Sequence, residues 1–165
     1  MTDFIIHGLD KRIFTPLFEN VNHEDPEMIS DPHRIYYYPR YLMADSDPGF
    51  PCRVSLVDAK KGEKVIAVNF MYHDVASPYQ GSGPIFIREN AVNASVGRNV
   101  IPDFLLHRVL SVRDYDKEYL MQEASITAGN ELNVIIKHLF NSAELIYLHI
   151  HNAKTGCFLC SVHRV

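Results

Sequence analysis

Residues 145–165, LIYLHIHNAKTGCFLCSVHRV, decide most of what this sequence predicts about fold and function. Two β-prone runs flank a short polar stretch at residues 152–156 that ends in glycine, a pattern typical of strand, turn and strand. With that loop, His151 would pair with Cys157, and His149 would pair with Leu159. The segment therefore predicts an antiparallel hairpin.

Alternation along the two predicted strands sorts their side chains onto two faces. One face is expected to belong to the core and to hold Ile146, Leu148, Ile150, Phe158, Cys160 and Val162. The other is expected to be polar and to hold Tyr147, His149, His151, Cys157, Ser161 and His163, with Leu159 as its single aliphatic residue. Cys160 is thus predicted to be inert, and Cys157 is the thiol of interest.

The predicted polar face offers a metal site. Residues two apart on a strand have Cβ atoms roughly 6.5–7 Å apart, so the rings of His149 and His151 can converge. Directly paired residues bring their Cβ atoms to about 5 Å, which would place the Cys157 sulfur beside His151. His149, His151 and Cys157 could then ligate a borderline-soft metal such as zinc and leave a fourth position for water or substrate.

The same residues offer thiol chemistry without a metal. His151 would stabilise the thiolate of Cys157, and Asn152 or a carboxylate would orient the ring, which gives a nucleophile or a redox thiol. A third interpretation assigns no chemistry to this face, because its histidines and thiol could simply form hydrogen bonds with Tyr147 and Ser161. The sequence leaves all three open.

The rest of the chain predicts an α+β fold, a mainly antiparallel sheet with helices on one side. Apolar residues recur at helical spacing between about 128 and 140, with Thr127 as the cap, and this helix would cover the second face of a central strand. Thr15-Pro16 and Asp25-Pro26 each predict the start of a short N-terminal helix. Strands are expected at residues 35–43 (at a sheet edge or bulge because of Pro39), 52–57, 65–72, 84–88, 109–115 and 123–126.

Length and composition predict one domain. The chain has 165 residues, of which 47% are apolar and 22% charged, enough for one hydrophobic core. We expect a single domain, 1–165, with an N-terminal layer over 1–43 and the main sheet and hairpin over 52–165. The turn-forming residues of 44–51 would join the two parts.

The net charge and the number of cysteines limit which binding partners and which cellular compartment we expect. The net charge of -4 has the wrong sign for wrapping a phosphate backbone, so nucleic-acid binding is not expected. Residues 1–14 mix charged with apolar side chains, which predicts neither a signal peptide nor a membrane span and favours a cytoplasmic location. Three cysteines in that compartment predict reduced thiols rather than a disulfide framework.

Three arginines next to predicted strands are candidate ligand-binding residues. Arg53, Arg88 and Arg113 would form a pocket for a carboxylate or a phosphate if they converged near the hairpin. The alternative is three separate ion pairs, with Asp58, Glu89 or Asp114 as partners.

Three segments read together resemble a known family. They are DPGFPCRVSL at 47–56, SPYQGSGPIFIRENA at 77–91 and YLHIHNAKTGCFLCSVHR at 147–164. Over about residues 44–164 the chain resembles a bacterial family catalogued as domain of unknown function 1203, which has no assigned activity, substrate or cofactor. The family's motif positions fall on Gly49, Phe50, Pro51, Cys52, Arg53, Pro78, Tyr79, Arg88, Arg113, His149, His151, Asn152, Gly156 and Cys157, and the resemblance adds Tyr79 to the candidate ligand-binding residues.

Two classes of function follow from these patterns. The first is a small-molecule site on the hairpin that uses Cys157, His151, His149 and Asn152, with thiol-based or zinc-assisted chemistry. The second is a non-catalytic interaction or structural module whose polar hairpin face packs against a partner or a second copy of the chain.

Overall fold

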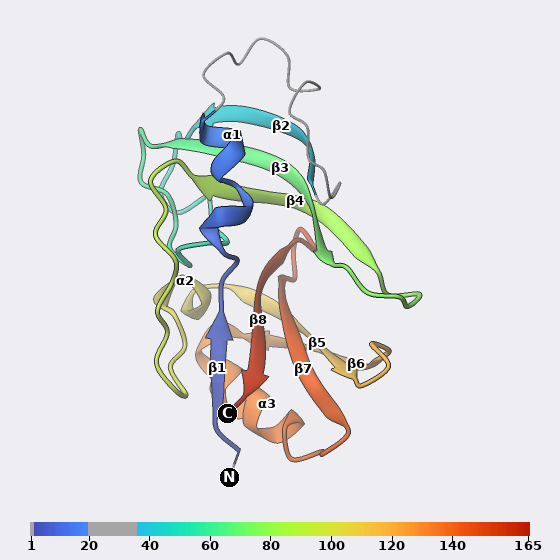
Figure 1. Ribbon diagram of the computed structural model, residues 1–165. Helices are drawn as coiled ribbons and strands as arrows, with labels where there is room; N and C mark the ends of the chain where they lie inside the picture. Colours follow the sequence, from blue (N-terminus) through green and yellow to red (C-terminus); the bar gives the residue numbers. More distant parts are fainter. Residues whose placement is uncertain (1, 20–35) are drawn as a thin grey trace.

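The computed structural model describes residues 2–19 and 36–165, and Figure 1 shows that these residues form two β-sheets with short helices. The five-stranded sheet has the order β1 (Phe4–His7), β8 (Phe158–Arg164), β7 (Leu145–Asn152), β5 (Val109–Asp116) and β6 (Met121–Ala128). The three-stranded sheet has the order β2 (Tyr36–Met43), β3 (Lys64–His73) and β4 (Gly81–Arg88). All neighbouring strands are antiparallel, which confirms the predicted α+β class.

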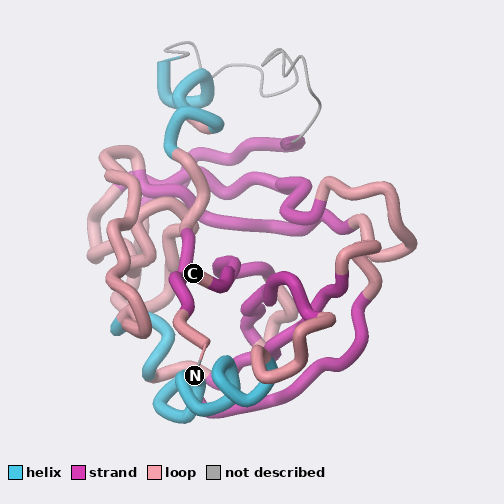
Figure 2. The backbone as a smooth tube through the Cα atoms, turned by 60° about the horizontal axis from the view of Figure 1, so that its bottom comes forward, coloured by secondary structure: helices cyan, strands magenta, loops and turns pink. Residues whose placement is uncertain are grey.

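The helices are short and lie at the two ends of the molecule, with the strands between them (Figure 2). They are η1 (Lys11–Ile13), α1 (Thr15–Glu19), α2 (Asp103–Leu106), η3 (Gly129–Glu131) and α3 (Leu132–Leu139). The predicted helix start at Thr15 is confirmed, whereas the one at Asp25 lies outside the described residues. Among the described helices, none is long and apolar enough to cross a membrane.

The helix predicted over 128–140 exists but begins later. Thr127 belongs to β6, and its hydroxyl donates to the carbonyl of Ala128 instead of capping the helix. Leu132, Ile136 and Leu139 pack with Leu110 and Leu148 of the five-stranded sheet. The expected role of this helix as cover for the central strand 65–71 is therefore wrong, because its apolar stripe is used by the other sheet.

The central strand was placed correctly, and a different helix covers it. Ile66, Val68 and Phe70 of β3 pack with Phe14 and Leu17 from the segment that ends in α1. The edge strand was also placed correctly, since β2 lies at the edge of its sheet and its register breaks at Pro39.

The strand predicted at residues 52–57 is wrong. Leu56 has φ +53° and donates its N–H to the carbonyl of Cys52, so the backbone folds back on itself. Only Cys52 pairs with a strand, through an isolated parallel bridge to Phe86 of β4. The hydrogen bonds of this turn, and not the apolar alternation, therefore determine the backbone conformation here.

The C-terminal hairpin forms, but its loop covers residues 153–157 instead of 152–156, and its register differs from the prediction. His149 lies opposite Ser161 and His151 lies opposite Phe158, so the predicted pairs with Leu159 and Cys157 are wrong. The loop is displaced by one residue, which places Phe158 opposite His151. A β-bulge between Ile150 and His151 then leaves Leu159 without a partner and places Ser161 opposite His149. As a result, Phe158 joins the face of His151, and Leu159 packs in the core.

Candidate functional site

The histidine face of the hairpin is covered by the chain itself. The rings of Tyr72 and His73, at the end of β3, lie 5.1 Å from His151 and 4.8 Å from His149. His149 is 5% exposed and His151 is 0% exposed. The expectation of a polar face open to a partner is therefore not met at these two histidines, because they lie between the two sheets.

Hydrogen bonds fix the tautomers of two of these imidazoles. His151 Nδ1 lies 2.9 Å from the carbonyl oxygen of Gly156, so Nδ1 carries the proton and donates. His73 Nδ1 likewise donates to the carbonyl of Tyr79 over 2.7 Å, and its Nε2 forms a hydrogen bond of 2.6 Å with the hydroxyl of Tyr147. The orientation of both rings is thus set by a backbone carbonyl.

Burial keeps the hairpin histidines uncharged. It lowers the pKa of His149 to about 2, and the nearby His73 and His151 act in the same direction. It lowers the pKa of His151 to about 4, opposed by the bond to the Gly156 carbonyl. His149 Nδ1 and His151 Nε2 are buried without a hydrogen-bond partner, an arrangement that costs free energy.

The predicted metal ligands are not brought together. Phe158 occupies the place beside His151 where Cys157 was expected. Within residues 2–19 and 36–165, no three side chains of His, Cys, Asp or Glu are arranged to hold a metal ion. The physical reason is that Cys157 lies in the loop, one position before β8 begins, and Phe158 takes the position opposite His151.

Cys157 is held at the end of a tightly bonded turn. Asn152 N–H donates to the Cys157 carbonyl over 2.9 Å, and Gly156 N–H donates to the Asn152 carbonyl over 2.7 Å. Gly156 has φ +77°, a conformation that favours glycine. The Cys157 sulfur is partly exposed and lies 2.9 Å from the hydroxyl of Thr155.

The other two cysteines are buried. Cys160 packs in the core of the five-stranded sheet, as predicted, and burial raises the pKa of its thiol. Cys52 packs in the core of the three-stranded sheet, and its sulfur accepts the backbone N–H of Arg88 at 3.4 Å. Both thiols are 0% exposed, so Cys157 is the accessible one of the three.

Arg53 reaches the hairpin from the edge of β4. Its N–H donates to the carbonyl of Phe86, and its carbonyl accepts the N–H of Leu9, so the backbone is fixed from both sides. The side chain is 1% exposed, and its Nε donates over 2.7 Å to the carbonyl of Phe158, the residue after Cys157. Its Nη1 donates to the carbonyl of Pro51 over 2.5 Å.

The charge of Arg53 has no carboxylate partner among the four ion pairs of the described residues. Burial lowers the pKa of its guanidinium, and the adjacent Cys157 thiol is the strongest group acting in the opposite direction, followed by Cys52. An arginine side chain stays protonated in proteins, so its charge must be balanced by a group nearby. The carbonyl oxygens of Phe158 and Pro51, which accept hydrogen bonds from the guanidinium, and the ring of Phe86 at 5.9 Å are such groups.

The remaining candidate residues lie in separate surroundings. Arg88 pairs with Glu63 over 2.6 Å, so this arginine forms an ion pair but not with the partners expected. Arg113 lies opposite His149 in the sheet, and it and Arg53 both lower the pKa of His151. Tyr79 is 38% exposed, and its carbonyl is the acceptor for His73.

Asn152 has a different role from the one predicted. Its side-chain oxygen accepts the N–H of Lys154 over 3.0 Å and thereby stabilises the turn. The carbonyl of Gly156, and not Asn152, orients the His151 ring. Asn152 also lines a cleft of about 300 Å³ together with Gly49, Pro51 and Arg108.

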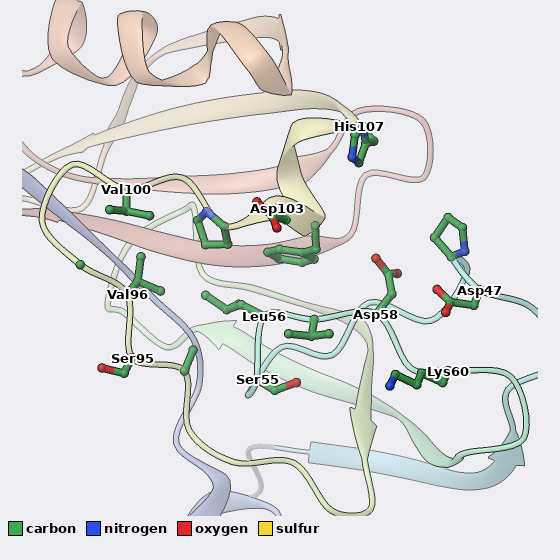
Figure 3. Close-up of a pocket in the computed structure, with 16 residues that line it drawn as sticks. Asp47, Ser55, Leu56, Asp58, Lys60, Ser95, Val96, Val100, Asp103 and His107 are labelled. Carbon is green, nitrogen blue, oxygen red and sulfur yellow. The ribbon is translucent and has the colours of Figure 1, made fainter.

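A larger cavity of about 600 Å³ continues from this cleft, and the two share Pro48, Asp58, Phe104 and His107. Figure 3 shows Leu56 and Asp58 on one wall, facing the loop that carries Val96 and Val100. The smaller cleft ends at Asn152, which is bonded to Cys157, but Cys157 lines neither space.

Sequence reasoning missed the role of three residues. Tyr72 and His73 cover the histidines, and the sequence signal available for them was only their place at the end of a strand. Thr155 contacts the thiol through the geometry of the turn, for which no periodic pattern exists. Arg53 was singled out, but its place next to Cys157, on the carbonyl of Phe158, depends on the 103 residues between positions 53 and 157 folding back.

Fold and site together define a class of protein: two antiparallel sheets that enclose a cluster of histidines and tyrosines, with a buried arginine bonded to the start of β8. The chain belongs to the family described as protein of unknown function (DUF1203), whose model matches residues 49–164. The resemblance drawn from the sequence blocks is thereby confirmed. No curated protein and no solved structure matches the chain.

Proposed function

We propose that this protein acts on small electrophilic molecules through the thiolate of Cys157, with Arg53 as the cation that stabilises it. One observation carries the proposal: Arg53 is 1% exposed, has no carboxylate partner among the described residues and donates to the carbonyl of Phe158, the residue after the accessible thiol. A thiolate next to a fixed positive charge is the reactive form of cysteine. The guanidinium thus replaces His151 in the role expected from the sequence.

His151 serves this site as a positioning residue. Its Nδ1–H holds the carbonyl of Gly156, which belongs to the peptide group that leads into Cys157. Because the ring is buried and neutral, it adds rigidity to the turn without adding charge. The sulfur is therefore held between two anchors, His151 on one strand and Arg53 on the edge of the other sheet.

The first prediction concerns alkylation of Cys157 in the native protein. Iodoacetamide forms an S–C bond with the thiolate and releases iodide, so its rate reports the thiolate fraction. We expect Cys157 to react faster than glutathione at pH 7 and to keep reacting at lower pH, as measured by mass spectrometry of the Cys157 peptide. Cys52 and Cys160 serve as internal references, because neither thiol is exposed in the fold.

Replacing Arg53 tests the source of that reactivity. Arg53→Met should lower the rate at pH 7 by about tenfold, the effect of losing an adjacent cation, while Arg53→Lys should retain part of it. Arg98→Met is the matched control, since Arg98 is exposed and pairs with Asp3. If wild-type Cys157 reacts no faster than glutathione at any pH, the proposal fails even if the Arg53 variants do not fold.

A further inference from the structure

Among the described residues, the outer edge of β6 from Ala124 onward is a sheet edge that is neither covered nor interrupted. β6 ends the five-stranded sheet, and its strand partner is β5. At the opposite edge, the N–H of Asn99 donates to the carbonyl of Phe4 in β1 over 2.9 Å. In the other sheet, a register break at Pro39 interrupts β2, and Cys52 pairs with the outer side of β4. Proteins protect their sheet edges in such ways because a row of free backbone groups pairs with other chains.

One backbone hydrogen bond shows which groups of β6 point outward. The N–H of Ala153, just beyond β7, donates to the carbonyl of Val109, so Val109 bonds toward β7 and not toward β6. Alternate residues of an antiparallel strand bond to the same side, so the residues two and four positions further along β5 also bond toward β7. Opposite them lie Ile126 and Ala124. The N–H and C=O groups of these two residues therefore point away from β5, and no backbone group of the described residues takes them up.

The side chains of this edge are apolar and exposed. Ile126 is 69% exposed, Ala124 is also exposed, and both lie on the face of the sheet that carries Arg113. β6 contains no proline, lysine or arginine. Its single charged residue, Glu123, lies at the register break, where its N–H donates to Asp114. The strand therefore lacks the residues that usually keep an exposed edge from pairing.

We infer that β6 pairs antiparallel with β6 of a second copy of this chain, so that two five-stranded sheets join into one continuous sheet. A two-fold axis at Ser125 fits the direction of the free backbone groups. It pairs Ala124 with Ile126 of the partner subunit, and Ile126 with the partner's Ala124, so the outward N–H and C=O groups of both residues are bonded. A shift by one residue would place outward groups opposite inward groups and lose these bonds.

The side chains of β6 are also self-complementary in this arrangement. The small Ala124 lies beside the larger Ile126 of the partner subunit, which allows close packing across the strands. Glu123 lies opposite the partner's Thr127, so no like charges face each other. Ser125 lies opposite the partner's Ser125, and two hydroxyl groups form a hydrogen bond at this separation. A second copy of the chain therefore matches this edge in backbone, size and charge.

The first test is the mass of the native protein by sedimentation equilibrium. A single strand edge is a small interface, so we expect a reversible dimer with a Kd below about 100 µM, measured between about 5 and 500 µM protein. A wild-type protein that stays monomeric over this whole range would overturn the inference. The measurement does not depend on the reactivity of Cys157, so this inference and the proposed function stand or fall separately.

A pair of lysine variants tests whether the edge of β6 is the interface. Ile126→Lys should raise the Kd at least about tenfold, because a charge on an edge strand opposes pairing. Val134→Lys is the matched control, since Val134 in α3 is also 69% exposed, and it should leave the Kd within about twofold. A dimer unaffected by Ile126→Lys, or weakened equally by both lysines, would overturn the assignment to β6.

A proline variant tests the backbone bonds directly. Ile126→Pro removes an N–H that β5 does not use, so the monomer should keep its sheet and its circular dichroism spectrum, whereas the dimer loses bonds on both sides of the axis. We expect a Kd at least about tenfold higher than in the wild type. A folded Ile126→Pro protein that dimerises like the wild type would contradict the inference.

Disulfide formation tests the register of the dimer. Ser125→Cys places two thiols in a non-hydrogen-bonded pair, where Cα atoms lie about 4.5 Å apart, a separation that a disulfide spans. Glu123→Cys is the control, because its opposite residue is Thr127. Both changes are made together with Cys157→Ser, so that the accessible native thiol does not react.

With a mild oxidant, Ser125→Cys should form a covalent dimer that dithiothreitol reverses, and Glu123→Cys should remain mostly monomeric on a non-reducing gel. Crosslinking of Glu123→Cys in preference to Ser125→Cys would overturn the axis at Ser125.

Discussion

At the scale of single residues, His149 and His151 make folding depend on pH. Both are buried as neutral imidazoles, and burial is the main cause of their low pKa values. Nearby groups lower the pKa further: Arg113, His73, His163 and His151 for His149, and Arg113, Arg53 and His73 for His151. A proton on either ring would place a charge between the sheets without a counter-ion. The folded state therefore disfavours protonation of either histidine.

The resulting prediction is a loss of stability in mild acid. The unfolded chain takes up protons on these imidazoles below about pH 6.5, whereas folded His151 stays neutral down to about pH 4. The unfolded state then binds more protons, so the free energy of unfolding is fully present above pH 6.5 and falls as the pH drops toward 4. His151 alone should account for roughly 3 kcal/mol over that window, measured by urea unfolding at a series of pH values.

A variant isolates this contribution. His149→Leu removes one of the two buried imidazoles and should flatten the decline of stability between pH 6.5 and 4. His107→Gln, at an exposed histidine, should leave the decline as it is in the wild type. An identical decline in His149→Leu and wild type would show that His149 does not titrate as the structure requires.

At the scale of elements, close approaches and turns hold the helices and the hairpin in place. Gly129 begins η3, where its N–H donates to the carbonyl of Arg108, and a Cβ at this position would lie 1.8 Å from the carbonyl oxygen of Leu105 in α2. Gly156 has the opposite constraint: nothing lies within 4 Å of its Cβ position, but its φ is +77°. Gly129 is required because a side chain would not fit there, and Gly156 is required because of its left-handed backbone conformation.

Alanine substitutions should separate these two constraints. Gly129→Ala should cost about 3 kcal/mol or more, because the clash is with backbone that cannot turn away. Gly156→Ala should cost about 1 kcal/mol, the strain of a left-handed conformation in a residue with a Cβ. Urea unfolding of both variants at pH 7 measures the difference, and equal losses would contradict this account of α2 and η3.

At the scale of the whole molecule, a half-buried ion pair links the turn after Cys52 to α2. Arg108, just beyond α2, donates from Nη2 to Asp58 over 2.6 Å and from Nη1 over 3.1 Å, and the two side chains are 15% and 12% exposed. The same turn carries Leu56 into the core of the five-stranded sheet, while Cys52 and Val54 pack in the other core. This short segment therefore joins the two hydrophobic cores and places Arg53 between them.

Removing one partner of this link should destabilise the whole fold. Arg108→Met leaves Asp58 partly buried and unpaired, at a cost of about 2 kcal/mol in the free energy of unfolding. Arg98→Met breaks an exposed pair, with side chains 63% and 37% exposed, and should change stability very little. Thermal unfolding monitored by circular dichroism compares the two, and a similar small effect for both would argue against a structural role for Asp58.

Much of the secondary structure was predictable because it follows from local patterns. The alternation in β7, the apolar run of β3, the helical spacing in α3 and the effect of Pro39 in β2 each depend on neighbouring residues alone. The expected strand at 52–57 failed because a turn closed by bonds between Cys52, Leu56 and Val57 outweighed propensity.

The sequence by itself determined the class of fold, the hairpin, the buried state of Cys160 and the family, since these depend on composition, periodicity and blocks of residues read in order. Only the tertiary structure decided which groups meet. A loop displaced by one residue placed Phe158 beside His151. The bridge at the edge of β4 brought Arg53 to the carbonyl of Phe158, the residue after Cys157. Such contacts depend on register and on packing between distant segments, and a one-residue shift in a strand exchanges the faces without changing the local pattern.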